Sequence, residues 1–249
     1  MSKIKLLSSN LINQIAAGEV VDRPYSVVKE LIENSIDAKA TQIDINIENG
    51  GHKSILVKDN GTGMSQDDLK IAFQRHATSK IKCAKDLENI NTLGFRGEAL
   101  PSIASVARVS AKSTDKNSLK SYRIIIESGE TKSLNEVAGV KGTQVLVKDL
   151  FCKIPARKKF LKKDDTEQRK IVELVRQYMI SNYKIAFTLK ANNKEIFKIH
   201  SSNSIEERIK NIFGKNLVDN LLPVSLDKAP YKINGFTGNL NTIKKRHGN

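Results

Sequence analysis

The segment VVKELIENSIDA, residues 27–38, carries three polar side chains whose types and spacing suit chemistry. Glu30, Asn34 and Asp37 lie four and three residues apart, so on a helix they share one face. A glutamate there can orient or deprotonate a water molecule, and an amide oxygen can bind Mg²⁺ whose other ligands are phosphates and water. No lysine or arginine stands among the three, and a lysine on that face would pair with Glu30 and weaken it as a base. A row of this kind is also typical of a solvated helix face, so other motifs must decide.

A second candidate is KDNGTGM, residues 58–64, which follows an apolar strand-like run. The Asp59 carboxylate can accept a hydrogen bond from the exocyclic amine of adenine, where guanine carries a carbonyl. Gly61 and Gly63 let backbone approach a flat ring closely. The alternative interpretation is a plain strand-to-helix turn, because Asp, Asn and Gly are common turn residues.

A third candidate is LGFRGEALPSIASV, residues 93–106, where Gly94 and Gly97 flank Phe95 and Arg96. A helix is predicted directly after this pair, with Pro101 in its first turn. The free N–H groups at such a helix start can hold phosphates. A loop with a C-cap glycine is the alternative. The chain contains neither a G-x-x-x-x-G-K-[ST] motif nor a G-x-G-x-x-G motif, and its scattered histidines disfavour a zinc site.

The hydrophobic pattern predicts the elements that must position these motifs. Apolar residues recur at helical spacing in residues 27–38, and Pro24 suits the first turn of that helix. Residues 41–48 alternate strictly and, across an NGG turn, predict a hairpin with residues 54–59. Between residues 76 and 97 no period holds, as in functional or mobile segments. Further helices are predicted at 66–73, 164–183, 205–213 and 217–222, and further strands at 106–113, 121–128, 143–151 and 231–237, with two short strands before residue 200.

The composition favours a polyanionic partner. Lys and Arg number 42 against 27 Asp and Glu, which gives a net charge of +15 in 249 residues. No apolar run is long enough to span a membrane, and the first residues do not form a secretory signal. The two cysteines, Cys83 and Cys152, lie far apart, so we expect a reduced, cytoplasmic protein.

Together these motifs resemble the N-terminal ATPase region of the MutL family of DNA mismatch repair proteins. That family lies in the superfamily of gyrase, the heat-shock chaperone and histidine kinases. The resemblance covers essentially the whole chain. ENSIDA and DNGTGM belong to the wider superfamily, whereas RHATSKI, GFRGEAL and NQIAAGEV are specific to the mismatch repair branch.

The resemblance implies an α/β fold, a two-layer sandwich with a mixed β-sheet of the Bergerat type. Residues 1–200 are expected to form the ATP-binding domain and residues 201–249 the truncated start of a second, smaller α/β domain of ribosomal S5-like type. Residues 151–161, FCKIPARKKFL, depart from the family pattern at Cys152, Lys153 and Ile154. The family also continues beyond the point where this sequence stops and there supplies a lysine that reaches the γ-phosphate, so we expect a fragment.

The implied function is an ATP-binding, slowly hydrolysing switch that couples mismatch recognition to downstream repair. The implied enzyme is a Mg²⁺-dependent ATPase, with ATP and Mg²⁺ as cofactors. By resemblance Glu30 is the general base, Asn34 the metal ligand and Asp59 the residue that reads adenine. The other implied nucleotide-binding residues are Gly61, Gly63, Met64, Thr78, Ser79, Lys80, Gly94, Phe95, Arg96, Gly97, Glu98, Ala99, Leu100 and Thr143.

The resemblance also implies partners: ATP or ADP, the mismatch-recognition protein MutS, and a downstream repair nuclease or helicase. The intact protein is expected to dimerise through its N-terminal region when ATP binds, and to lie in the cytoplasm with the nucleoid rather than on a membrane. A non-catalytic DNA-binding or interaction module is the competing class. A histidine kinase is a weaker alternative because no phosphoacceptor helix precedes Glu30, and GFRGEAL argues against a gyrase-like topoisomerase.

A basic segment, residues 150–163, indicates a DNA-binding surface, because no acidic residue interrupts it. The chain has no tryptophan and 5% aromatic residues, and no recognition helix is evident. We therefore expect phosphate contacts to double- or single-stranded DNA without sequence preference. A solvated lysine surface is the alternative. The candidate contacts are Arg157, Lys158, Lys159, Lys162 and Lys163, with Lys244, Lys245 and Arg246 as a second cluster.

Overall fold

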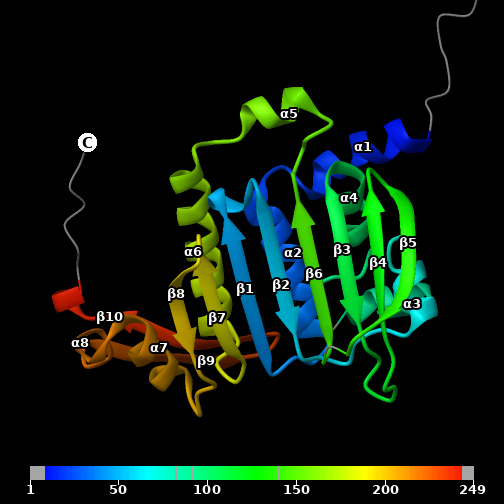
Figure 1. The fold of residues 1–249 in the computed structure, drawn as a ribbon. Coiled ribbons are helices and arrows are strands. Elements are labelled where there is room, and N and C mark those ends of the chain that lie inside the picture. The colour runs from blue at the N-terminus through cyan, green and yellow to red at the C-terminus, as the bar shows by residue number, and fades with distance from the viewer. Residues whose placement is uncertain (1–8, 82, 91, 140, 243–249) are drawn as a thin grey trace, which may run out of the picture.

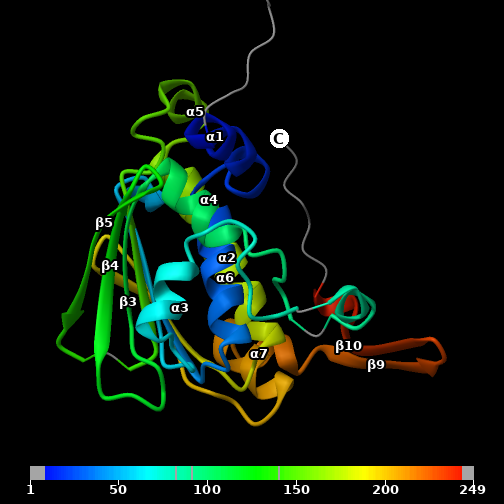
Figure 2. The ribbon, with the colours of Figure 1, turned by 90° about the vertical axis from the view of Figure 1, so that its right-hand side faces the viewer.

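The chain folds into a sheet that is covered on one face by helices (Figures 1 and 2). The computed structural model describes residues 9–242 apart from 82, 91 and 140. The helices are α1 (Ser9–Val20), α2 (Pro24–Asp37), α3 (Gln66–Ile71), α4 (Ala99–Val106), α5 (Pro155–Phe160), α6 (Asp164–Ser181), α7 (Ile205–Phe213) and α8 (Lys215–Val218). The strands are β1 (Gln42–Glu48), β2 (Ser54–Asp59), β3 (Arg108–Ser113), β4 (Ser121–Glu127), β5 (Glu130–Val137), β6 (Thr143–Lys148), β7 (Ala186–Ala191), β8 (Lys194–Ile199), β9 (Leu221–Lys228) and β10 (Tyr231–Gly238).

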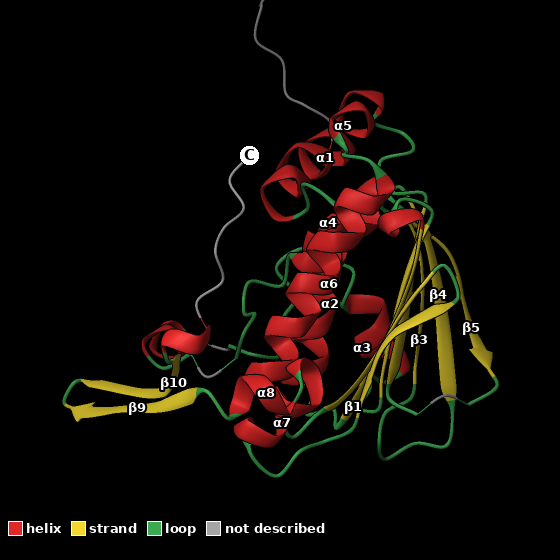
Figure 3. Ribbon diagram, turned by 90° about the vertical axis from the view of Figure 1, so that its left-hand side faces the viewer, coloured by secondary structure: helices red, strands yellow, loops and turns green. Residues whose placement is uncertain are grey.

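The main sheet is mixed, as the family resemblance implies. Its eight strands run in the order β5-β4-β3-β6-β2-β1-β7-β8, and β1 and β7 form its parallel pair. The predicted hairpin is present, since β1 pairs antiparallel with β2 and Ile43 lies opposite Asp59. Figure 3 shows the helices gathered on one side of this sheet, which confirms the two-layer α/β fold.

The core lies between the sheet and α2. On β1 the residues Ile43, Ile45 and Ile47 are fully or almost fully buried and alternate with half-exposed polar residues. On α2 the apolar stripe that includes Val28 and Ile32 is buried against them. Burial of this face stabilises the fold through the hydrophobic effect and determines which face of α2 is directed toward the core. The opposite side of α2 is therefore left to face the cavity described below.

Several smaller elements differ from the sequence prediction. Strand β5 was not predicted, because its side chains are polar and mostly exposed, as is usual on an edge strand. Helix α5 was not predicted either, since it buries no residue and has no apolar stripe. The helix predicted at 217–222 is wrong beyond Val218: β9 begins at Leu221 and pairs with β10. Pro223 suits an edge strand better than a helix interior.

The C-terminal elements divide into a packed helix and a projecting hairpin. Arg208 of α7 is fully buried and donates hydrogen bonds to the carbonyl oxygens of Tyr183 and, at 2.7 Å, Ile185. Helix α7 is therefore held against the end of α6. Strands β9 and β10 form a separate two-stranded sheet that projects away from the main body (Figure 3). Within the described residues, no helix is long and apolar enough to cross a membrane.

Candidate active site

A cavity of about 1480 Å³ lies on the helical side of the sheet. It is bounded by α2, the end of β2, residues 76–80 and 92–101, and the start of β6. Among the sequence-predicted site residues, it is lined by Glu30, Asn34, Asp59, Gly63, Met64, Thr78, Ser79, Lys80, Gly94, Phe95, Arg96, Gly97, Glu98, Ala99, Leu100 and Thr143. Gly61 does not line it, but the Gly61 N–H donates a 2.9 Å hydrogen bond to Asp59 Oδ1. Motifs far apart in the sequence thus meet at one cavity.

Two lysines contact the row of Glu30, Asn34 and Asp37 on α2. The expectation that this face is free of basic residues was therefore wrong. Lys29 Nζ lies 3.1 Å from Glu30 Oε1. Lys80 Nζ lies 2.9 Å from Asn34 Oδ1 and 2.6 Å from Asp37 Oδ2. The long lysine side chains reach the row from a neighbouring position on the helix and from a distant loop, which helical spacing does not reveal.

Asp37 connects both ends of the lid segment, which we define as residues 76–97. Besides Lys80, it accepts hydrogen bonds from the backbone N–H groups of Leu93 at 3.0 Å and Gly94 at 3.2 Å. Near the same place Gly97 has a φ of +65°, and a Cβ there would lie 2.4 Å from the carbonyl oxygen of Ala77. The two ends of the segment therefore lie side by side, and glycine is required at that contact.

At the end of β2, the Asp59 carboxylate accepts hydrogen bonds from three donors. Its Oδ2 accepts from Ser35 Oγ at 3.0 Å, and its Oδ1 accepts from the N–H groups of Gly61 at 2.9 Å and Thr143 at 3.4 Å. Burial raises the pKa of the Asp59 carboxyl above its ordinary value, and the three hydrogen bonds oppose that rise. The side chain is thus fixed in orientation while it lines the cavity.

Gly63 is required by a close contact with the backbone, whereas the sequence suggests that it allows close approach to a flat ring. Gly63 has a φ of +67°, and a Cβ there would lie 1.8 Å from the carbonyl oxygen of Thr114. The close contact is with the chain after β3, whereas close approach to a ring stays a prediction. Beside it, Ser113 Oγ accepts from the Met64 N–H at 2.8 Å and lies 2.9 Å from Thr143 Oγ1. This network fixes Met64 and Thr143 at the cavity wall.

The start of α4 supplies backbone donors at another part of the cavity wall. Residues 94–100 line it, and α4 begins at Ala99 with Pro101 in its first turn, as predicted. The first N–H groups of a helix have no acceptor within the helix, so this end can bind an anion. The Arg96 guanidinium lies 5.4 Å from the Phe95 ring centre. Glu98 pairs with Arg75 at 3.8 Å and His76 at 3.5 Å.

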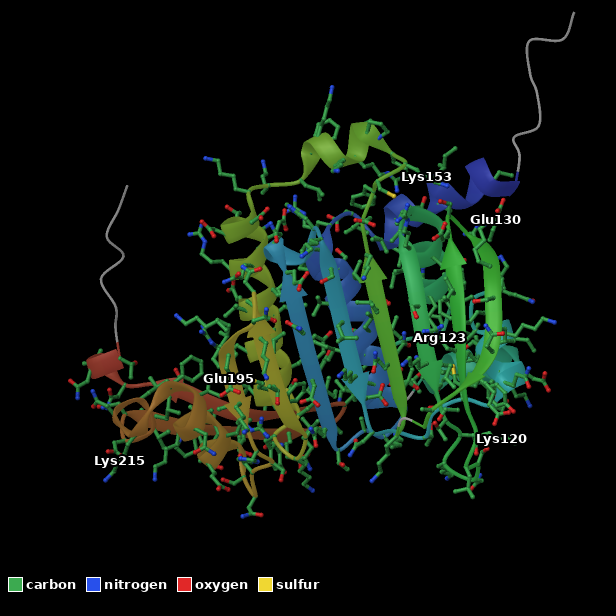
Figure 4. The ribbon with its side chains drawn as sticks, viewed as in Figure 1. Lys120, Arg123, Glu130, Lys153, Glu195 and Lys215 are labelled. Atoms are coloured by element: carbon green, nitrogen blue, oxygen red, sulfur yellow. The ribbon has the colours of Figure 1, made fainter. Side chains whose placement is uncertain are left out.

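The predicted DNA-binding residues lie apart from the cavity, on α5 and the turn after it. Lys158, Lys159, Lys162 and Lys163 are exposed. Arg157 differs, because its Nη2 donates to the carbonyl oxygen of Ile15 in α1 at 3.3 Å. Figure 4 labels Lys153 at this end of the molecule. The second basic cluster, Lys244, Lys245 and Arg246, lies outside the described residues.

Several residues that hold the site residues or α2 in place through hydrogen bonds were not predicted from the sequence. Ser35 holds Asp59, and its place next to Asn34 in the ENSIDA motif was the available signal. Glu33 and Tyr178 are bonded to each other at 2.5 Å although 145 positions separate them. That contact joins α6 to α2 and has no local signature in the sequence.

This combination of layered fold and cavity matches a known class of nucleotide-binding ATPases. Residues 23–150 match the family model described as histidine kinase-, DNA gyrase B- and HSP90-like ATPase. The matched region begins at the residue before α2 and ends after β6, so it contains the α2 row, Asp59, the lid segment and the start of α4.

Comparison with curated relatives indicates a family within this class of ATPases. The chain is 46% identical to the DNA mismatch repair protein MutL of Clostridium perfringens over 96% of its own length and 36% of that relative. It is 44% identical to MutL of Christiangramia forsetii over 98% of its length and 40% of the relative. The chain thus spans little more than a third of the curated relatives that it matches.

Solved structures agree with these relatives. The Aquifex aeolicus MutL ATPase domain complexed with ADP aligns with a TM-score of 0.67 and 34% identity, over 83% of this chain and 73% of that one. The N-terminal domain of a DNA repair protein aligns with a TM-score of 0.75 and 28% identity, over 90% and 70%. The chain belongs to the histidine kinase-, DNA gyrase B- and HSP90-like ATPases, within the DNA mismatch repair MutL family.

Proposed function

We propose that this chain is the ATP-binding and slowly hydrolysing module of a DNA mismatch repair protein. In this role it acts as a nucleotide-driven switch that couples mismatch recognition to later repair steps. The observation that carries the proposal is the single cavity at which Glu30, Asn34, Asp59 and the start of α4 meet. Family membership and the ADP complex of the Aquifex aeolicus domain support the same conclusion.

Adenine binds at the Asp59 end of the cavity in this proposal. The fixed carboxylate accepts the exocyclic amine, and guanine, with a carbonyl at that position, is disfavoured. Gly63, Met64 and Thr143 complete the base site, and Gly61 contributes to nucleotide binding through the hydrogen bond from its N–H to Asp59. The hydrogen bonds that hold Asp59 support this role, because a specificity-determining acceptor must keep its orientation.

The triphosphate binds at the start of α4. The N–H groups of Gly97, Glu98, Ala99 and Leu100 donate hydrogen bonds to the phosphate oxygens, and Gly94, Phe95 and Arg96 surround the phosphates. Thr78, Ser79 and Lys80 contact the nucleotide from the lid segment. Asp37 contacts both Lys80 and Gly94. A ligand that displaces either residue therefore also changes the position of the other.

Glu30 acts as the general base. Its carboxylate takes a proton from a water molecule as the water oxygen attacks the γ-phosphorus, and ADP departs as the bond to the bridging oxygen breaks. In this step Glu30 gains one proton and inorganic phosphate is formed. The place of Glu30 on the same wall of the cavity as Asn34 supports this assignment.

The residues present fit Mg²⁺. Asn34 Oδ1 already faces a cation, the Lys80 ammonium at 2.9 Å, so the local field suits positive charge. One amide oxygen, with phosphates and water, is a typical ligand set for Mg²⁺. When bound, the ion neutralises charge on the phosphates. The proposal assigns Asn34 as its ligand from the protein.

Separate measurements of binding and turnover test the proposal. Calorimetry with ATP, ADP and GTP, each with Mg²⁺, should show binding of the adenine nucleotides, and phosphate release from ATP should be slow but measurable. Binding without phosphate release would favour the competing class, a non-catalytic interaction module. Equal affinity for GTP would contradict the assignment of Asp59.

We also propose that the exposed lysines of α5 and the following turn bind DNA phosphates without sequence preference. Lys158, Lys159, Lys162 and Lys163 carry this surface, whereas Arg157 is engaged with α1. In the intact protein, the proposed partners are a mismatch-recognition protein of the MutS type and a downstream nuclease or helicase. ATP-dependent dimerisation and a cytoplasmic, nucleoid-associated location complete this proposal.

The domain division at residue 200 stays a prediction, and the packing of α7 sharpens its test. The buried Arg208 ties α7 to the end of α6, whereas β9 and β10 form their own sheet. Limited proteolysis should cut near residues 201–204 if the second unit starts there. A first cut after α7 would move the boundary to about residue 214.

A further inference from the structure

Glu33 is a buried carboxylate at the cavity wall that the proposed reaction does not use. It lies on α2 between Glu30 and Asn34 in sequence, and it is 8% exposed. A buried charge is costly unless it is paired. Here Tyr178 of α6 donates a 2.5 Å hydrogen bond to Glu33 Oε1, and Lys29 Nζ donates a 3.0 Å hydrogen bond to Oε2.

The same ammonium contacts the proposed base. Lys29 Nζ lies 3.1 Å from Glu30 Oε1, so one cation bridges two carboxylates. Burial alone would lower the pKa of Lys29, but the bonds to Glu33 and Glu30 outweigh it and raise that pKa. Burial and the bond to Glu33 raise the pKa of Tyr178. Both donors therefore keep their protons at neutral pH.

We infer that Lys29, Glu33 and Tyr178 are positioning residues that hold the Glu30 carboxylate in place to take a proton from the attacking water. The inference rests on the proposed function of Glu30. The chain of contacts runs from Tyr178 on α6 through Glu33 to Lys29 and ends at Glu30. Its far end is anchored in a second helix, so the orientation of Glu30 does not depend on α2 alone.

Two physical reasons support a positioning role. A glutamate that lines an open cavity loses side-chain entropy when it is fixed, and a contact to one oxygen lowers that cost at the moment of reaction. Lys29 contacts Oε1 of Glu30, which leaves the other oxygen for water. Glu33 shares the ammonium, so Lys29 does not form an exclusive ion pair with the base.

Substitutions of the residues in this chain of contacts test the inference in the 249-residue protein. Lys29→Met should lower kcat about tenfold, because a small displacement of a base is sufficient for such a loss, while ATP affinity changes less than about twofold. Lys29→Arg should recover most of the lost rate, since it keeps a cation with several donors. Tyr178→Phe, which removes one hydroxyl group, should lower kcat less than Lys29→Met. Lys29→Met combined with Tyr178→Phe should be no worse than Lys29→Met alone, because both act through one contact chain.

Lys53→Met is the matched control. It removes another lysine–glutamate pair, Lys53 with Glu48 at 3.0 Å, that does not line the cavity. Its kcat and ATP affinity should equal those of the parent. If Lys29→Met also left kcat unchanged, or lowered affinity and kcat equally without rescue by arginine, the positioning role would be wrong.

A second measurement separates this inference from the proposed function. If the parent hydrolyses ATP but Glu30→Gln is equally active, the proposed function of Glu30 fails first. If Glu30→Gln is inactive and Lys29→Met is fully active, the inference alone fails. Crystal structures of the parent and Lys29→Met with a non-hydrolysable ATP analogue should show the Glu30 carboxylate displaced in the variant, and an unmoved carboxylate would overturn the inference even without turnover data.

Discussion

The ammonium of Lys80 lies 2.9 Å from the amide oxygen of Asn34, the atom that we propose as the Mg²⁺ ligand. The same ammonium lies 2.6 Å from Asp37 Oδ2. A lysine from the lid segment thus occupies the position next to Asn34 where a metal ion is expected. If Mg²⁺ binds Asn34 as proposed, Lys80 would have to leave the amide oxygen, because two cations at one oxygen repel each other.

Asn34→Ala should lose the dependence of ATP binding on Mg²⁺. In the parent, ATP affinity measured by calorimetry should fall at least about tenfold when EDTA replaces Mg²⁺, a difference of about 1.4 kcal/mol. In the variant, the two affinities should be similar and low. Asn117→Ala, at an exposed loop, serves as a control. A variant whose affinity still depends on Mg²⁺ as in the parent would remove Asn34 from the metal site.

The lid segment should become more protected when nucleotide binds. Hydrogen exchange of the Leu93 and Gly94 amides reports on it directly, because both donate to Asp37. Asp37→Ala should speed exchange of these two amides without nucleotide, and an ATP analogue should slow exchange across residues 76–97 in the parent. Exchange that is the same with and without the analogue would contradict a role of this segment as a lid.

Asp59→Asn should weaken ATP binding without lowering stability at neutral pH. An amide cannot supply the same charge-assisted acceptor, so we expect a loss of about tenfold or more in affinity. The stability effect follows from the raised pKa of Asp59 in the folded state. The folded protein binds this proton more tightly than the unfolded chain, so the ionised carboxylate costs stability as the pH rises through the folded-state pKa.

The melting temperature of Asp59→Asn should therefore equal or exceed that of the parent at pH 7. The difference should shrink as the pH falls toward the ordinary range of an aspartate. Thermal unfolding followed by circular dichroism between pH 5 and 8 checks the trend. A variant that is less stable than the parent at pH 7, and relatively more stable at pH 5, would reverse the expected sign.

DNA binding should depend steeply on salt and weakly on sequence. Replacing Lys158, Lys159, Lys162 and Lys163 with Glu should weaken all duplexes alike, because exposed lysines contact phosphates rather than bases. Fluorescence anisotropy at several salt concentrations gives the log–log slope, about −0.9 per phosphate neutralised. A charge-reversed variant that binds as the parent does would remove this surface from the DNA interface.

Much of the fold could be predicted because strong periodic patterns coincide with buried faces. The apolar stripe of α2 and the alternation of β1 both face the core, and α3 begins where the helix at 66–73 is predicted, with Ser65 accepting from the Asp68 N–H as its cap. Strand β5 and helix α5 could not be predicted in this way, since neither presents an apolar face. Their structure depends on neighbours rather than on their own pattern.

The candidate site was predictable where its motifs are contiguous and not where it depends on tertiary contacts. Glu30, Asp59 and the GFRGEAL loop stood out in the sequence, and all line the cavity. The pairing of Lys80 with Asn34 joins residues 46 positions apart, and Tyr178 reaches Glu33 from another helix. Such contacts depend on how the lid segment and α6 fold over α2, which no local pattern encodes.

In the proposed mechanism Glu30 activates water while other residues bind the nucleotide. Glu30→Ala, measured by calorimetry for ATP binding and by phosphate release for turnover, tests it most directly. The ATP affinity of the variant should stay within about twofold of that of the parent, while kcat should fall about a hundredfold or more. Turnover equal to the parent, with ATP bound as tightly, would contradict it.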